Sequence, residues 1–529
     1  MIKKCFAFLE YLLTFLGFAA MYFFLIPDSD VFFFSRDYEK SISSVLHNAL
    51  YYGNGRLLGN IIGFGFSMNF LYSFLVVSVT LTLIVLLMNK FFFNGDYRTV
   101  IPLALAVAFP CSGYVSEIYY QFPSFVNFVI PFVFIFAALC LLKNEKKIVS
   151  SVFIFIFSAA SCLFSENTTI FAFTLSVLAA VYRYLQSKKL SIPNLSFVAG
   201  TSVGGLIMLL IPKILDTAGN LDSYHGKAGS ISAVITSALA AFSLFADILS
   251  KLAVPLIIIS GAFIFLLNKE SEVSKPIKNI LSVLLAFFPI EAFIYSTFSQ
   301  YGPPSTYFLI FQGGLLIIYA VVLFIAILCL KKSQFKQLNI CLYILTLSSF
   351  GPMLLAYLYG WRTFYIPYIV IIAYAIVLFK KILAYIPGSI RAKASSSGAG
   401  SLFAAAMTFA FLCLSLTVFI QSVYNYDFFV ARTQIIAENA VSEDSPQEIK
   451  VPVLPCRSIS CEDENPTLIE SIQYKTGSKN KITVAESIYC TDAGKYGEIL
   501  NSNPLSAAIR AFQSLEFKND EYIFDLLAK

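Results

Sequence analysis

The chain has 529 residues, of which 58% are hydrophobic and only 13% are charged. Soluble domains carry about 25% charged residues, so this composition excludes an ordinary soluble protein and indicates an integral membrane protein. The formal net charge of +6 comes mostly from lysines at the ends of apolar runs, so it reflects membrane topology and does not indicate a nucleic-acid partner. The apolar runs are about 20 residues long and do not alternate with polar residues, which favours helices over a β-barrel.

Residues 1–426 form a predicted transmembrane domain of about thirteen membrane-spanning helices. The first apolar run follows Lys3 and Lys4 like a signal peptide. Because it lacks a small-residue cleavage site before Pro27, we expect an uncleaved first span. The third span is short for a bilayer. The spans are expected at residues 5–26, 62–89, 99–112, 123–142, 148–164, 168–186, 194–213, 250–268, 279–298, 306–330, 338–358, 363–383 and 402–424.

The distribution of Lys and Arg predicts the orientation of these spans. With the N-terminus inside, about twenty Lys and Arg fall in cytoplasmic turns and about six fall in the opposite turns. Positive charge is retained on the cytoplasmic side of membranes, so the N-terminus is expected in the cytoplasm. The first outer loop, residues 27–60, and the C-terminal region are then extracytoplasmic. The predicted location is the cell (plasma) membrane.

Residues 427–529 are more polar and are predicted to form a small extracytoplasmic α/β domain. The runs IKVPVLP and KITVAE have the composition of short strands, and helices are expected near 504–515 and 520–528. A disulfide between Cys456 and Cys461 is one alternative, and Cys490 leaves an odd cysteine in this region.

The sequence lacks the short motifs of several enzyme classes. No P-loop, GxGxxG, HExxH or paired CxxC motif occurs, so neither an ATP site nor a dinucleotide site is predicted. With only two histidines, His47 and His225, a histidine metal centre is not expected. No cofactor is predicted. The outer carboxylates offer ligands for a divalent metal, but that reading is not favoured.

Charged residues next to apolar runs are the candidate functional groups. A charge at membrane depth costs several kcal/mol, so such residues usually face a cavity or a partner. On the predicted outer side these residues are Asp37, Arg56, Glu117, Glu166 and Arg362, and Glu291 lies within a span.

Each acidic candidate also has a structural interpretation. Asp37 could be the N-cap of a short helix, because an Asp side chain satisfies free amides there. Glu117 and Glu166 could each form a structural ion pair with Arg56 or Arg362. Glu291 is interpreted as a buried structural carboxylate or as one partner of a pair.

The order of these motifs resembles that of the GT-C membrane glycosyltransferases, and most closely that of the GtrII-like bacterial group. In that group an acidic DD-aromatic motif in the first outer loop is followed by a GR pair that opens the next helix. Here SRDY places Asp37 at the second acidic position, with Arg36 at the first, and Gly55–Arg56 follows at the matching distance. The runs EIYYQFPSFVNFVIP and FSENTTI also resemble the group's stretches, with Tyr119–Tyr120 where Trp is more usual.

The resemblance implies an all-α polytopic fold that transfers a sugar from a polyprenyl-phosphate donor to a glycan or lipid acceptor at the outer face. As general base, Asp37 would take the acceptor's proton. Arg56 and Arg362 would stabilise the departing lipid phosphate, because guanidinium groups match phosphate oxygens. Glu117 and Glu166 would orient the acceptor or hold the arginines.

Two other functions remain open from the sequence. A polysaccharide polymerase or ligase would share the lipid-phosphate chemistry. A transporter or flippase of lipid-linked glycans would carry a charged central path, and Glu291 is the main feature in its favour.

Overall fold

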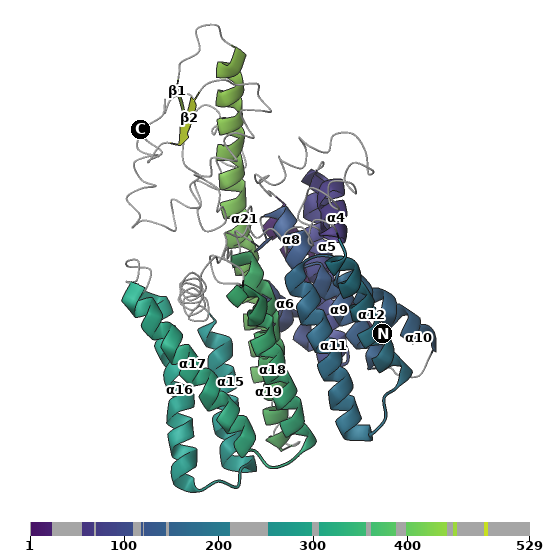
Figure 1. The fold of residues 1–529 in the computed structure, drawn as a ribbon. Coiled ribbons are helices and arrows are strands. Elements are labelled where there is room, and N and C mark those ends of the chain that lie inside the picture. Colours follow the sequence, from purple (N-terminus) through teal and green to yellow (C-terminus); the bar gives the residue numbers. More distant parts are fainter. Residues whose placement is uncertain are drawn as a thin grey trace, which may run out of the picture.

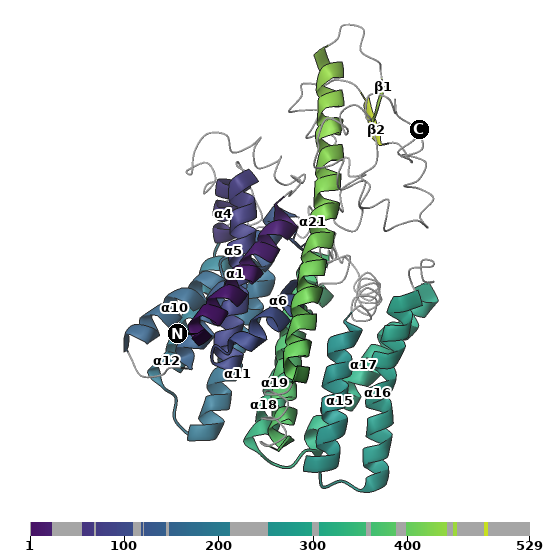
Figure 2. The same ribbon diagram turned by 180° about the vertical axis from the view of Figure 1, so that it is seen from behind.

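The structure, a computed structural model, is a bundle of α-helices from which one long helix protrudes (Figure 1). The helices form an N-terminal group and a C-terminal group, which lie on opposite sides of α18, α19 and α21 (Figures 1 and 2). The structure describes residues 2–23, 56–67, 70–108, 118–119, 121–143, 148–211, 252–298, 306–355, 361–387, 398–441, 448–451 and 481–484.

The N-terminal group is made from short and long apolar helices. It also contains the 3-10 turn η1 (Tyr97–Thr99) before α6. Its helices are α1 (Ile2–Tyr22), α4 (Leu57–Ser67), α5 (Phe70–Phe93), α6 (Val100–Ala108), α8 (Phe122–Phe128), α9 (Pro131–Leu142), α10 (Ile148–Ser161), α11 (Glu166–Ser187) and α12 (Ile192–Leu209).

The C-terminal group contains α15 to α17, and the helices between the two groups complete the bundle. The 3-10 turn η4 (Trp361–Phe364) leads directly into α19. The remaining helices are α15 (Ala253–Glu270), α16 (Lys275–Phe298), α17 (Thr306–Cys329), α18 (Gln334–Leu355), α19 (Tyr365–Tyr385) and α21 (Gly398–Val441).

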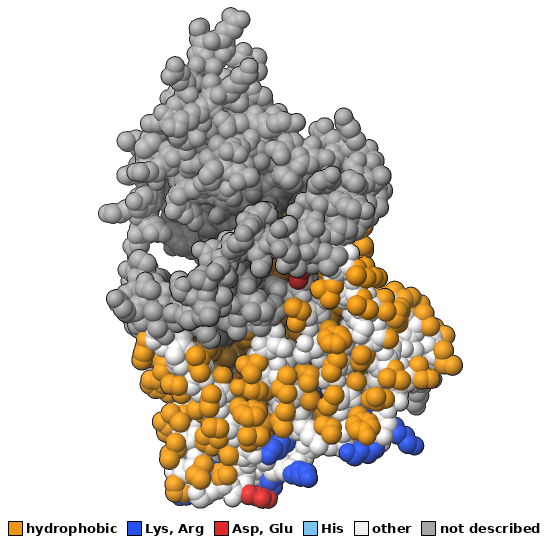
Figure 3. All heavy atoms as spheres, viewed as in Figure 1, with side chains coloured by type: hydrophobic (Ala, Val, Ile, Leu, Met, Phe, Trp, Pro, Cys, Tyr) orange, Lys and Arg blue, Asp and Glu red, His pale blue; other side chains and the backbone are white. Residues whose placement is uncertain are grey.

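Among the described residues, ten helical segments are long and apolar enough to cross a membrane. Each of the thirteen predicted spans overlaps a helix. Three of these helical stretches are not among the ten long apolar segments: α10 and the stretch from η1 through α6, which are shorter apolar helices, and α18. Apolar side chains cover most of the surface drawn in colour in Figure 3. The prediction of a multi-pass membrane protein built from α-helices is therefore confirmed for the membrane domain.

Two predicted spans are each divided into two helices. The stretch predicted as 62–89 contains the end of α4 and most of α5. The stretch predicted as 123–142 contains α8 and α9, and α9 begins at Pro131. Proline has no N–H and suits the first turn of a helix, so Pro131 ends one helical ladder and starts another. The predicted span 123–142 agrees with the apolar segment Phe122–Leu142, and the predicted span 62–89 overlaps the apolar segment Ser73–Phe93.

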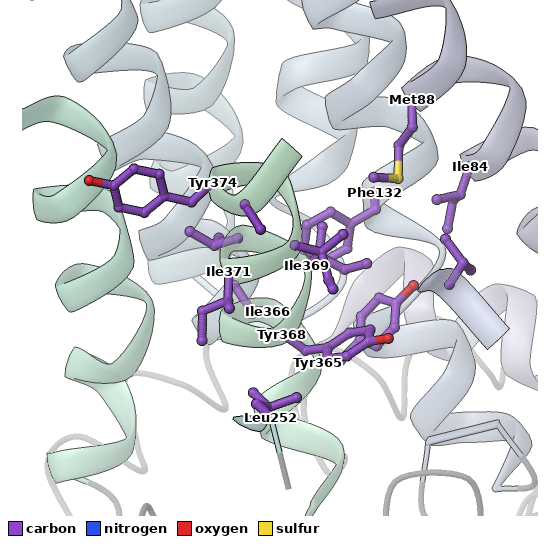
Figure 4. Close-up of a cluster of buried hydrophobic side chains, with 14 of the residues drawn as sticks. Ile84, Met88, Phe132, Leu252, Tyr365, Ile366, Tyr368, Ile369, Ile371 and Tyr374 are labelled. Carbon is purple, nitrogen blue, oxygen red and sulfur yellow. The ribbon is translucent and has the colours of Figure 1, made fainter. Parts of the chain in front are cut away.

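Buried aromatic and branched side chains hold α19 in the centre of the bundle. Tyr365 and Ile366 are completely buried, and Ile369 is 2% exposed. Figure 4 shows these α19 residues packed beside Phe132 of α9 and Ile84 of α5. The core therefore joins the central helices to the N-terminal group.

Small residues bring α10 and α12 unusually close. Gly200 and Gly204 on α12 are separated by three residues and face α10. A Cβ at Gly204 would lie 2.9 Å from the Ala159 Cα and would overlap the Ala159 carbonyl oxygen. Helices in membranes associate through such small residues because lipid offers little hydrophobic drive for their contact.

Helix α21 extends the structure beyond the bundle. It has 44 residues and is about 66 Å long at the usual helical rise, whereas its apolar segment covers only Leu402–Val423. Beyond it, β1 (Glu448–Val451) pairs in parallel with β2 (Lys481–Val484) (Figure 1). Both predicted strands are confirmed. The helices predicted near 504–515 and 520–528 lie outside the described residues, as do Cys456, Cys461 and Cys490.

Candidate functional site

An arginine and a glutamate meet where two helices of the N-terminal group begin. Arg56 directly precedes α4, and Glu166 is the first residue of α11. The Arg56 Nη2 and Glu166 Oε2 atoms are 3.4 Å apart, and the two side chains are 25% and 43% exposed. The Arg56 guanidinium also lies over the Phe128 ring of α8, 5.5 Å from its centroid. The ion pair is thus supported by an aromatic face and remains accessible.

The capping of α11 fixes the position of Glu166. Ser165 is the N-cap, and its side chain accepts a hydrogen bond from the Thr168 N–H, while the Thr168 hydroxyl accepts one from the Ser165 N–H. Ser165 and Thr168 are fully buried. A carboxylate in the first turn is favoured by the positive end of the helix dipole. The helix end and Arg56 therefore both hold the Glu166 side chain at this position.

The start of α4 is tied to the turn before α11. The Leu58 N–H donates to the Leu163 carbonyl at 2.9 Å. A Cβ at Gly59 would lie 3.3 Å from the Phe164 carbonyl oxygen and would overlap the amide of Asn127. Only glycine allows this approach, so Gly59 lets Arg56 reach Glu166.

Helix α8 carries buried polar side chains beside this pair. Ser124 donates to the Gln121 side chain at 3.0 Å, and the Asn127 amide donates to the Pro123 carbonyl at 2.8 Å. Asn127 is 3% exposed, and its Oδ1 has no hydrogen-bond partner among the described residues. A buried polar atom without a partner is uncommon and often marks a functional position. Asn127 was not predicted as a site residue, although it is the only amide in the apolar run FPSFVNF.

A group of tyrosines packs behind α8. The Tyr119 ring lies 5.8 Å from that of Tyr22 and 6.0 Å from that of Tyr365. Its hydroxyl donates to the Val107 carbonyl at 2.5 Å. The aromatic pair noted in the sequence thus contributes at least one ring, Tyr119, to the rigid core next to the candidate site.

The structure brings together part of the predicted site. It pairs Arg56 with Glu166, which is one of the two interpretations that the sequence left open for this glutamate. Arg362 lies in η4, and both η4 and α4 pack against α8, but the Arg362 side chain is outside what the structure describes. Asp37 and Glu117 are also outside the described residues, so their predicted roles stay predictions.

Glu291 lies in the C-terminal group. It is on α16, and the Gln312 side chain of α17 donates a hydrogen bond to it. Glu291 is therefore one partner of a polar pair, but its partner is an amide and carries no charge.

Within the described residues, no three His, Cys, Asp or Glu side chains gather in a group able to hold a metal ion. The chain matches no known family model, and no curated protein shows significant similarity to it.

Proposed function

We propose that the protein is an integral-membrane glycosyltransferase of the GT-C type. It moves a sugar from a polyprenyl-phosphate donor to a cell-surface glycan or lipid acceptor at the outer face of the plasma membrane. The observation that carries this proposal is the accessible Arg56–Glu166 pair over Phe128, where α4 and α11 begin. A guanidinium held in this way can bind a lipid phosphate through two parallel hydrogen bonds, which supports the proposal.

The proposed orientation follows from the charged ends of the bundle. In the coloured part of the surface in Figure 3, the Lys and Arg side chains gather at the lower end, away from the protruding part of α21. Positive charge marks the cytoplasmic side of membrane proteins. The N-terminus is then cytoplasmic, and α4, α8 and the C-terminal domain face the outside.

The proposed reaction is a single inverting displacement. The acceptor hydroxyl oxygen bonds to the anomeric carbon as the bond from that carbon to the phosphate oxygen breaks. Asp37 takes the hydroxyl proton, and polyprenyl phosphate leaves with the bonding electron pair. Arg56 and Arg362 stabilise the charge that develops on the phosphate. Glu166 holds Arg56 in place, and Glu117 orients the acceptor. Membrane lipid surrounds the polyprenyl chain, and no metal or nucleotide is required.

The general-base assignment is tested by replacing Asp37 with Asn in the full chain. Membranes containing the variant are supplied with a radiolabelled polyprenyl-phosphate sugar, and transfer to the acceptor is measured at matched protein levels. Asp37→Asn is expected to abolish transfer, because an amide cannot accept the hydroxyl proton. Transfer at the wild-type rate would show that Asp37 is not the base.

A transporter or flippase of lipid-linked glycans is a second candidate, favoured by the Glu291–Gln312 pair within the C-terminal helices. It differs from the transferase in its product. A transporter leaves the donor's sugar–phosphate bond intact, whereas the transferase releases free polyprenyl phosphate, which is separable by chromatography.

A further inference from the structure

Glu291 combines a membrane position with incomplete hydrogen bonding. Gln312, which is 1% exposed, donates to the Glu291 Oε1 atom. The Oε2 atom of Glu291 is buried and has no hydrogen-bond partner among the described residues. The carboxyl group thus has one polar neighbour that cannot neutralise a negative charge.

A groove of about 420 Å³ opens beside this carboxyl group. Its other described lining residues are apolar and belong to the same face of α16: Val283, Ala286, Phe287, Ile290 and Ile294. Phe287 and Ile290 are each more than half exposed, so the groove is accessible from the lipid-facing surface. A smaller cavity of about 120 Å³ adjoins it across Ala286 and Ile290 and reaches Ser260 and Gly261 of α15.

No described charged group compensates Glu291 from the helices around it. Helices α15 and α17 pack against α16. The described ionisable side chains of these two helices are Lys269 and Glu270 at the far end of α15, and Tyr319 and Cys329 of α17. Tyr319 is hydrogen-bonded to Ser260 at 2.9 Å. Along α16 itself, Tyr295 lies one turn away, and the nearest described charge is Lys278, about 20 Å distant at the helical rise.

An ionised carboxylate in such surroundings is costly, because no described cation faces it and apolar side chains line the groove beside it. The neutral acid fits the contacts better, since Oε1 can accept from Gln312 while Oε2 carries the proton. Glu291 lies seven residues before Phe298, about 10 Å along the axis from the end of α16. The proton therefore has its shorter path toward that end of the helix.

From these observations we propose that Glu291 is a proton-binding site within the membrane. The carboxyl group binds a proton in these apolar surroundings, and it accepts a hydrogen bond from Gln312. It is open to the apolar groove along α16, and it exchanges its proton with the side of the membrane at which α16 ends. This site is separate from Arg56 and Glu166, so it stands independently of the proposed sugar transfer.

The test uses dicyclohexylcarbodiimide, an apolar reagent that modifies protonated carboxyl groups in membrane proteins. The purified full chain is treated at several pH values between about 6 and 9, and modified residues are located by peptide mass spectrometry. Glu291 is expected to be modified at low pH and several-fold more slowly at high pH. Glu166, which is paired with Arg56, serves as the internal control and is expected to remain unmodified.

Two variants make the result specific. Glu291→Gln is expected to remove the adduct while leaving the protein monodisperse on gel filtration. Gln312→Leu removes the donor that supports the ionised form, so modification of Glu291 should extend to higher pH. Absence of the adduct at every pH would overturn the proposal, as would modification at the same rate across the pH range. An unchanged pH profile in Gln312→Leu would overturn the role of the pair.

Discussion

Glu166 and Glu291 are the same type of residue in two different environments of one helical bundle. Glu166 begins a helix, lies 3.4 Å from a guanidinium and is 43% exposed. Glu291 lies inside a helix, accepts from an amide and has one oxygen without a described partner. The first environment supplies a guanidinium and a partly exposed position, whereas no described cation faces Glu291 in the second. From this comparison we infer that Glu166 positions Arg56 and that Glu291 holds a proton.

The two regions also differ in packing. In the N-terminal group, Gly204 of α12 lies so close to α10 that a methyl group would overlap its backbone. In the C-terminal group, a Cβ at Gly261 of α15 would meet no atom within 4 Å, and a cavity adjoins this position. The close backbone contact thus lies in the group that carries the candidate site, and the open glycine position lies in the group that carries the groove beside Glu291.

The largest expected effect is on the rate of sugar transfer, which should depend on Arg56 and not on Glu291. Arg56→Gln should lower sugar transfer by about a hundred- to a thousand-fold, the range found when a donor to a developing negative charge is removed. Glu291→Gln should leave transfer near wild type. Initial rates with a labelled polyprenyl-phosphate donor measure both. Equal losses in the two variants would contradict the assignment of separate roles.

The next effect concerns the close contact between α10 and α12. Gly204→Ala should destabilise the protein by about 1–3 kcal/mol, because the added methyl group must displace backbone atoms. Gly261→Ala is the matched control, and it should be neutral or slightly stabilising, since alanine favours helices and space is free there. Thermal unfolding in detergent compares them. A lower midpoint for Gly261→Ala than for Gly204→Ala would reverse the packing comparison.

A smaller effect is expected at the cap that positions Glu166. Ser165→Ala removes a buried capping hydrogen bond and should cost about 1 kcal/mol. Ser191 is the N-cap of α12, but its side chain accepts from the Asn194 side chain and not from a backbone N–H, so Ser191→Ala leaves the backbone donors of α12 unchanged and should change stability less. Unfolding midpoints of the two variants provide the measurement. The same loss of stability in both variants would mean that the hydrogen bonds between Ser165 and Thr168 do not stabilise the start of α11.

The smallest effect is expected from the ion pair itself. Glu166→Gln should lower stability by no more than about 1 kcal/mol, because partly exposed ion pairs contribute little and salt screens them. The difference from wild type should shrink as salt is raised to about 1 M. A loss that is large and independent of salt would instead indicate a buried structural role for Glu166.

Much of the fold follows from patterns that the sequence displays directly. Apolar runs of membrane length located the helices, and the strands around Ile449 and Ile482 were predicted from short β-rich runs. The division at Pro131 was missed because the apolar run continues through it, although proline alone could have indicated it.

The candidate site was predictable only in part. The sequence marked Arg56 and Glu166 as unusual charges and offered their pairing as one interpretation, which the structure confirms. It did not indicate Phe128 as a neighbour of Arg56 or Asn127 as a neighbour of Gly59, because both contacts depend on the packing of α4 against α8. Contacts between residues so distant in sequence carry no local signal.

The central claim is that Arg56 binds the phosphate of a polyprenyl lipid. Its most direct test is equilibrium binding of polyprenyl phosphate to the purified full chain, with Arg56→Gln beside the wild type and Arg56→Lys as the charge-retaining control. The account predicts binding by wild type, weaker binding by Arg56→Lys and at least about tenfold weaker binding by Arg56→Gln, which corresponds to about 1.4 kcal/mol. Equal affinities of wild type and Arg56→Gln would contradict it.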